Sequence, residues 1–205
     1  MSQKISVPVV KGLSRAAISR QTELFLIRIQ NSGFKIKYPL PVLDILEFGY
    51  LKKLFGYDWS TEELQDSLKG YTEFGKKKLV LSQATYEGAS DGNPMDLFTV
   101  THELGHVALH TDQIRARLYE KMEIVKMNRG SIKPYLDPEW QANEFAAALL
   151  MPQSRVVEII QSNQVTPENI ICEEFGVSDM AARFRIDNVS KEMKKNPSRN
   201  GGLFY

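Results

Sequence analysis

Apolar residues recur at helical spacing near the start of the chain and predict a first helix over residues 14–30. Ser14 is a good N-cap for this helix, and residues 1–12, which contain Pro8 and Gly12, are expected to form an extended arm. The apolar side of such a helix packs against the rest of the protein. The side chains expected in the core are those of Ala17, Ile18, Leu24, Phe25, Leu26 and Ile27.

After Pro39 and Pro41 the helical spacing gives way to short apolar runs separated by glycines. These runs predict a helix over residues 42–46, strands over residues 54–57, 71–74 and 78–82, and a loop over residues 88–92. The lysines at positions 76–78 fall at the turn between two of these strands, where a solvated turn is the simplest interpretation, and we assign them no function.

A helix that is apolar nearly all round is predicted to begin near Pro94, with Asn93 as its cap and Asp96 in its first turn. A helix of this character is normally buried. A further, amphipathic helix is predicted over residues 113–127, where apolar residues recur at helical spacing among charges. Those apolar residues are Ile114, Leu118, Met122 and Val125.

The apolar helix contains all three histidines of the chain, and two of them follow the pattern His-Glu-x-x-His. Residues four apart lie on one helix face, about 6 Å apart along the axis, so His102 and His106 can bind one metal ion. Glu103 borders that face and is the candidate general base, which would take a proton from a nucleophilic water. Hydrogen-bonded core histidines are the alternative, but polar side chains in a buried helix are costly without a partner such as a metal.

The third ligand is expected from a second helix that opens with Asp137 and Pro138 and runs to residue 150, before Pro152. Glu139 and Glu144 both lie on it, about 140° apart, so only one of them can face the ion. Asn143 lies one turn from Glu139 on the same face and can hydrogen-bond the ring nitrogen of a ligand histidine that does not bind the metal.

His110 lies eight residues, about 12 Å, from His102, which is too far for the three histidines to share one ion. Its role is left open between a contact near the metal or substrate and a contact with the last carbonyls of the helix.

Two stretches together resemble the ImmA/IrrE group of zinc metallopeptidases: His102-Glu103-Leu104-Gly105-His106 with residues 98–101 before it, and Glu139-x-x-Ala142-Asn143-x-Phe145-Ala146-x-x-Leu149-Leu150-Met151-Pro152. The resemblance spans roughly residues 40–190. It implies that Glu139, not Glu144, is the third ligand. The spacing of Glu139 and Asn143 is also similar to the Glu-x-x-x-Asp helix of thermolysin-like gluzincins, whose acidic residue orients a zinc histidine.

The resemblance implies an α+β fold, with a mainly helical, zincin-like core, a small sheet and a C-terminal helix-turn-helix-like segment. We expect an N-terminal arm and helix over residues 1–38, the metallopeptidase core over 39–163, the helix-turn-helix-like segment over 164–190 and a flexible tail over 191–205. Residues 166–189 leave DNA binding open, because helix-turn-helix spacing is used for DNA recognition, but Arg183, Arg185 and later lysines are the only basic side chains on the second helix.

Composition adds few constraints. The net charge of +1 over 205 residues gives no general attraction to nucleic acid or membranes, and no apolar run approaches the roughly 18 residues of a membrane span. No secretory signal opens the chain, and the one cysteine, Cys172, reads as a small core residue, so a cytoplasmic protein is expected.

Together, these features predict a zinc-dependent endopeptidase in which His102, His106 and Glu139 hold the ion and Glu103 is the general base. Manganese and iron are left open as the native metal. The resemblance implies that the substrate is a helix-turn-helix transcriptional repressor, cut to derepress genes of a mobile element or a stress response. Two alternatives remain: a DNA-binding regulator, and a partner-binding protein with a structural zinc site and no proteolysis.

Overall fold

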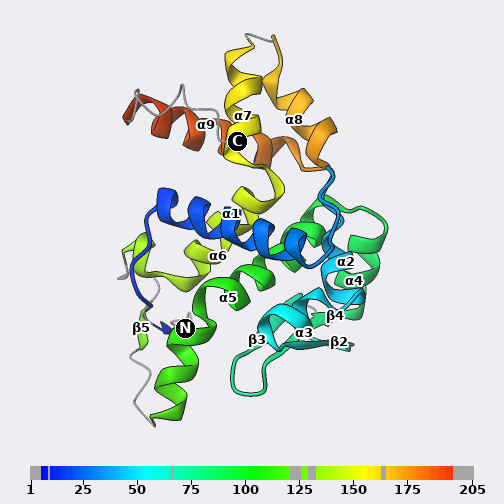
Figure 1. Ribbon diagram of the computed structural model, residues 1–205, viewed down its shortest axis with the longest axis vertical. Coiled ribbons are helices and arrows are strands. Elements are labelled where there is room, and N and C mark those ends of the chain that lie inside the picture. Colours follow the sequence, from blue (N-terminus) through cyan, green and yellow to red (C-terminus); the bar gives the residue numbers. More distant parts are fainter. Residues whose placement is uncertain are drawn as a thin grey trace.

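The computed structural model arranges most of the chain around one long helix, α5 (Figure 1). It describes residues 6–8, 10–65, 67–120, 126–128, 133–162 and 165–195. The helices are α1 (Arg15–Asn31), α2 (Val42–Glu47), α3 (Tyr50–Phe55), α4 (Gln83–Ser90), α5 (Pro94–Tyr119), the 3-10 helix η2 (Pro134–Leu136), α6 (Pro138–Leu150), α7 (Gln153–Gln161), α8 (Pro167–Phe175) and α9 (Asp179–Lys195). The strands are β1 (Ser6–Pro8), β2 (Asp58–Glu62), β3 (Gly70–Glu73), β4 (Lys78–Ser82) and β5 (Lys126–Asn128). The predicted α+β class is confirmed.

Three helices begin at the positions that their capping residues predicted. The side chains of Ser14, Asn93 and Asp137 accept hydrogen bonds from backbone amides in the first turns of α1, α5 and α6. Pro94 and Pro138 occupy the first helical positions of α5 and α6, where a missing N–H costs nothing. These starts matter for function because they set where α5 and α6 present their polar side chains.

A three-stranded sheet lies beside the N-terminal half of α5, with its strands in the order β2–β4–β3 (Figure 1). β4 pairs in parallel with β2 and antiparallel with β3. β4 spans the predicted residues 78–82, and its central residues Leu79, Val80 and Leu81 are fully buried. β3 agrees closely with the predicted strand at 71–74 and forms an edge of this sheet, in contact with α5. A separate antiparallel pair joins β1 to β5.

Two local predictions in this region are wrong. The predicted strand at residues 54–57 contains the end of helix α3, and the strand itself begins at Asp58. Gly56, with a φ of 70°, ends α3 and lets the chain turn into β2. The predicted loop at residues 88–92 contains the last turn of helix α4. Ser82 is the N-cap at the start of this helix. The glycines there end or permit a helix and do not exclude one.

The predicted helix over residues 113–127 is also incorrect as a separate element. α5 continues without a break to Tyr119, so Ile114 and Leu118 belong to the same helix as the His-Glu-x-x-His pattern. Met122 and Val125 lie outside the described residues, and residues 126–128 form strand β5.

Helix α1 packs on α6 and turns a narrower face to the core than predicted. Ile18, Phe25 and Ile29, spaced by seven and four residues, are buried. Leu24 and Ile27 are 44% and 51% exposed, so their assignment to the core is wrong. They lie off the face defined by the buried residues, since each residue rotates by about 100° around a helix.

Helices α7, α8 and α9 gather at one end of the molecule (Figure 1). Gly176, with a φ of 65°, makes the turn between α8 and α9. α9 runs to Lys195, into the range expected to be a flexible tail, and the rest of that range lies outside the described residues. Buried apolar side chains from α1 through α9 form one cluster, and the predicted division into segments stays a prediction. No helix in the described ranges has the length and apolar character needed to cross a membrane.

Candidate metal centre

The candidate metal centre lies where α5 packs against α6. Gly105 on α5 and Ala142 on α6 meet at this contact, and both residues are buried. Small residues allow two helix backbones to approach closely. Because the two helices lie this close, Glu139, one turn before Ala142 on α6, lies beside the face of α5 that bears His102 and His106.

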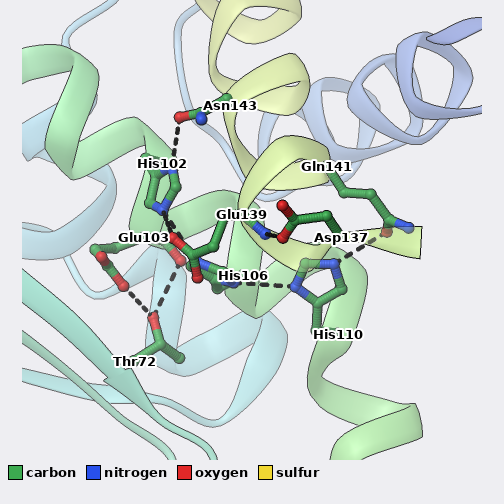
Figure 2. A network of polar contacts seen from close by, with 9 residues as sticks. All are labelled: Thr72, His102, Glu103, His106, His110, Asp137, Glu139, Gln141 and Asn143. Atoms are coloured by element: carbon green, nitrogen blue, oxygen red, sulfur yellow. Dashed lines mark hydrogen bonds and ion pairs between the residues drawn. The ribbon is translucent and has the colours of Figure 1, made fainter. Parts of the chain in front are cut away.

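His102, His106 and Glu139 form the one group of potential metal ligands found among the described residues (Figure 2). One donor atom from each residue lies within 4.8 Å of the others. The Nε2 atoms of the two histidines are 3.0 Å apart, and the Glu139 carboxylate oxygens lie 3.5 Å from His102 Nε2 and 3.4 Å from His106 Nε2. Sequence reasoning named these three residues, and the fold brings them together.

The donor set fits a small divalent cation. Two nitrogens bound tetrahedrally to zinc at about 2.0–2.1 Å lie about 3.3 Å apart, close to the spacing of these two Nε2 atoms. The opposite ring nitrogen of each histidine already has another partner: Asn143 for His102 and His110 for His106. Both Nε2 atoms therefore face one place beside the Glu139 carboxylate, and a cation bound there would be shared by all three groups. Two histidines and one carboxylate form a ligand set used for catalytic zinc, although manganese and iron also bind such donors.

The charges in the group suit cation binding. The pKa of the Glu139 carboxyl lies well below its ordinary value, because hydrogen bonds with His102 and then with His106 stabilise the carboxylate. Burial acts to lower the pKa of His102, but the hydrogen bond to Glu139 and the negative charges of Glu103 and Glu139 outweigh it, so this pKa is raised. The raised pKa of His102 reflects the negative charges of Glu103 and Glu139, and the same charges would attract a cation.

Glu103 directly follows His102 in the sequence. Its side chain is buried, but it is not part of the ligand group. The hydroxyl of Thr72 on β3 donates to Glu103 Oε2 at 2.7 Å and also lies 3.3 Å from the Glu103 carbonyl oxygen (Figure 2). The sheet therefore holds the Glu103 carboxylate in place. Sequence reasoning missed Thr72, because nothing in a short strand indicates which side chain will reach a helix about thirty positions away.

The two glutamates of α6 have separate surroundings. Glu144 is 5% exposed and forms an ion pair with Arg15 of α1, 2.8 Å away, so it anchors α1 to α6. Asn143 Oδ1 lies 2.8 Å from His102 Nδ1, the contact expected from its position one turn after Glu139. Its effect on metal binding stays a prediction.

His110 is fully buried behind His106 and is not at a helix end, because α5 continues for more than two turns beyond it. The alternative in which it contacts the last carbonyls of its helix is therefore wrong. Its Nδ1 lies 3.0 Å from His106 Nδ1, and its Nε2 lies 3.1 Å from Gln141 Oε1 (Figure 2). Burial and then the charge of His106 lower the pKa of His110 to about 3. Gln141 was also missed from the sequence, because it is one of several polar residues in the first half of α6 and nothing there shows that it would be buried beside His110.

The fold and this group define a class of protein: an α+β protein with a His-Glu-x-x-His helix facing a glutamate from a second helix. Residues 86–187 match the family described as Peptidase_M78, IrrE N-terminal-like domain, and this part of the chain belongs to that family. The match includes the whole candidate centre except Thr72.

A solved structure described as a Mycobacterium tuberculosis transcriptional regulator has a similar fold, with a TM-score of 0.52 and 18% sequence identity. The likeness covers 82% of this chain and 45% of that one, so this chain spans less than half of its neighbour. No curated protein matches the chain.

Proposed function

We propose that this protein is a divalent-metal-dependent endopeptidase. The observation that carries the proposal is the gathering of His102, His106 and Glu139 around one point, with the carboxylate of Glu103 adjacent in sequence but outside the ligand group. A structural metal site needs ligands alone and is usually closed by four protein side chains. Three ligands with a separate buried carboxylate beside them are the arrangement of a hydrolytic site.

Each residue has a distinct role in the proposed reaction. His102, His106 and Glu139 would hold the ion, which supplies Lewis acidity that polarises a peptide carbonyl and makes a water more acidic. Glu103 accepts the proton of the attacking water and passes it to the leaving nitrogen. Thr72 keeps the Glu103 carboxylate oriented by donating to Oε2. Asn143 holds the ring of His102 through Nδ1.

The position of β3 supports an extended peptide as the substrate. β3 is an edge strand of the sheet, paired on one side with β4, and it carries Thr72 next to Glu103. A peptide can add to such an edge through backbone hydrogen bonds, as many peptide-binding proteins do. A substrate strand lying there would pass beside the general base.

We further propose that the substrate is a helix-turn-helix transcriptional repressor. Membership of the IrrE N-terminal-like family and the description of the structural neighbour as a transcriptional regulator both support a role in gene control. Zinc is the proposed native metal, with manganese and iron to be compared in the same assay.

The description of that neighbour also favours a second candidate, a regulator that binds DNA through α8 and α9. The described side chains argue against it. Arg185 is 4% exposed, with its Nε donating to the Met151 carbonyl, and Arg183 is paired with Asp179 and Glu168. Buried Arg185 is not available for phosphates, and Arg183 would have to leave its carboxylate partners to bind them.

The proposal is tested by incubating the full chain with helix-turn-helix repressors from the same genome, beginning with any that is encoded beside its gene. Metal-loaded protein should cut the repressor, chelator-treated protein should not, and added zinc should restore the cut, which mass spectrometry of the fragments would locate. No cleavage at full metal occupancy would reject the peptidase and support a partner-binding protein. Duplex DNA binding with a steep salt dependence would support the DNA-binding regulator.

A further inference from the structure

The side-chain amide of Gln141 has an unambiguous orientation. Its Nε2 donates to the Lys11 carbonyl at 2.9 Å and to the Tyr135 carbonyl at 2.7 Å. Both N–H groups are therefore used, and the opposite orientation would place the amide oxygen against two carbonyl oxygens. Gln141 is fully buried, so water does not offer an alternative partner. The Oε1 atom must then face His110, where it lies 3.1 Å from Nε2.

This orientation determines the protons on two histidine rings. Gln141 Oε1 can only accept, so His110 carries its proton on Nε2 and leaves a lone pair on Nδ1. That lone pair faces His106 Nδ1 at 3.0 Å, so His106 carries its proton on Nδ1. For two neutral rings, any other assignment would bring two protons or two lone pairs together at one of these contacts. When His106 is neutral, its lone pair is then on Nε2, the atom that faces Glu139 and His102 (Figure 2).

We infer that His110 and Gln141 are positioning residues that set the tautomer and the ring orientation of His106 for metal binding, and that the N-terminal segment anchors them through Lys11. The inference rests on the proposed metal centre. A ligand histidine usually donates its second N–H to a carboxylate or a carbonyl, and here a neutral histidine takes that place. The chain of contacts runs from the backbone of residue 11, outside the family match at 86–187, to the centre.

The N-terminal segment is well placed to hold this series of contacts. The Val10 and Leu13 amides donate to the Leu136 and Tyr135 carbonyls, which ties the segment to the turn before α6. The Lys11 amide donates to Gln113 Oε1 on α5, 2.8 Å away. Residue 11 therefore contacts both α5 and α6, the two helices that supply the ligands.

Nitrogen-15 NMR of the histidine rings tests the assignment directly in the wild-type protein, since the chain has three histidines. In metal-free and zinc-loaded protein alike, the proton of His110 should be on Nε2 with Nδ1 bare, and His106 Nδ1 should carry a proton. A proton on His110 Nδ1 would overturn the inference, and this reading requires no variant to fold.

Three variants then test the consequence for metal binding. Gln141→Leu and His110→Phe should each weaken zinc affinity by about 10- to 100-fold and allow the His106 proton to move to Nε2. Thr22→Val is the control, because it removes a buried hydrogen bond, from Thr22 to the Ile18 carbonyl, that involves neither the histidines nor residue 11. Its zinc affinity and ring spectra should equal those of the wild type.

The two proposals fail in different ways. Wild-type zinc affinity and unchanged His106 spectra in Gln141→Leu and His110→Phe would refute the positioning role while leaving the peptidase intact. A wild-type protein that binds zinc tightly but cuts nothing would refute the peptidase, and the tautomers and affinities would still decide the role of His110 and Gln141.

Discussion

Gly105 on α5 faces Ala142 on α6 so closely that a Cβ atom at position 105 would lie 3.1 Å from the Ala142 carbonyl oxygen and 3.2 Å from its Cα. Both of these atoms belong to the backbone of α6, so no side-chain rotation can relieve the contact. The distance between the two ligand-bearing helices therefore depends on the missing side chain of Gly105.

Gly105→Ala should therefore weaken metal binding. At an ordinary helix position this change stabilises a protein by about 1 kcal/mol, but overpacking a close contact costs about 1–3 kcal/mol. We expect a net loss of unfolding free energy and weaker zinc affinity, measured by denaturation and by metal titration. Gly75→Ala is the control, because a Cβ there meets nothing within 4 Å. A stabilised Gly105→Ala protein with normal affinity would show that the helix contact is not limiting.

Glu139 and Glu144 should respond differently to removal of their carboxylates. Free zinc at about 100 times its dissociation constant should raise the unfolding free energy of the wild type by about 2.7 kcal/mol. Glu139→Ala should lose this increase. Glu144→Ala should lose about 1.5–3 kcal/mol of stability with its bond to Arg15 but keep the increase. The ligand assignment is wrong if the two variants exchange these behaviours.

Asn143→Ala should lower zinc affinity by about 10- to 100-fold, because Asn143 orients the ring of His102 through Nδ1. The side chain is exposed, so its loss should leave the unfolding free energy of the metal-free protein nearly unchanged. Asn169→Ala, at an exposed position on α8, serves as the control. Unaltered affinity would leave Asn143 as a surface residue without effect on the centre.

The capping residues and the histidine spacing could be read from the sequence because they act locally. Ser14, Asn93 and Asp137 cap helices within a few residues of themselves, and His102 and His106 share a face by helical geometry alone. The strand at residues 78–82 was equally clear, because a short buried apolar run has few alternatives.

The parts that sequence reasoning missed depend on contacts between distant segments. Thr72 and Gln141 acquire their roles from a strand and an N-terminal segment that meet α5 and α6 only in the folded chain. Leu24 and Ile27 were assigned to the core by their character, but the side of α1 that faces α6 is set by packing. The periodicity of one helix does not show which neighbour covers it.

Thr72→Val should impair catalysis without affecting metal content. The bond from Thr72 to the Glu103 carboxylate is charge-assisted and worth about 1.5–3 kcal/mol, which corresponds to about a 10- to 100-fold fall in kcat. KM should change little, because Thr72 acts through Glu103. Thr72→Ser retains the hydroxyl and should recover most of the rate. Equal rates in Thr72→Val and the wild type would show that Thr72 has no role in catalysis.

In the proposed reaction, Glu103 acts as a general base beside a metal that other residues hold. Glu103→Gln preserves the size of the side chain and its ability to hydrogen-bond, so the fold and the zinc content should match the wild type. General-base catalysis typically contributes about 10²- to 10⁴-fold, and cleavage should fall by that amount. The decisive measurement is therefore the rate of repressor cleavage by wild type and Glu103→Gln at matched zinc content. We expect a loss of at least about 100-fold in Glu103→Gln, whereas equal rates would rule out Glu103 as the general base.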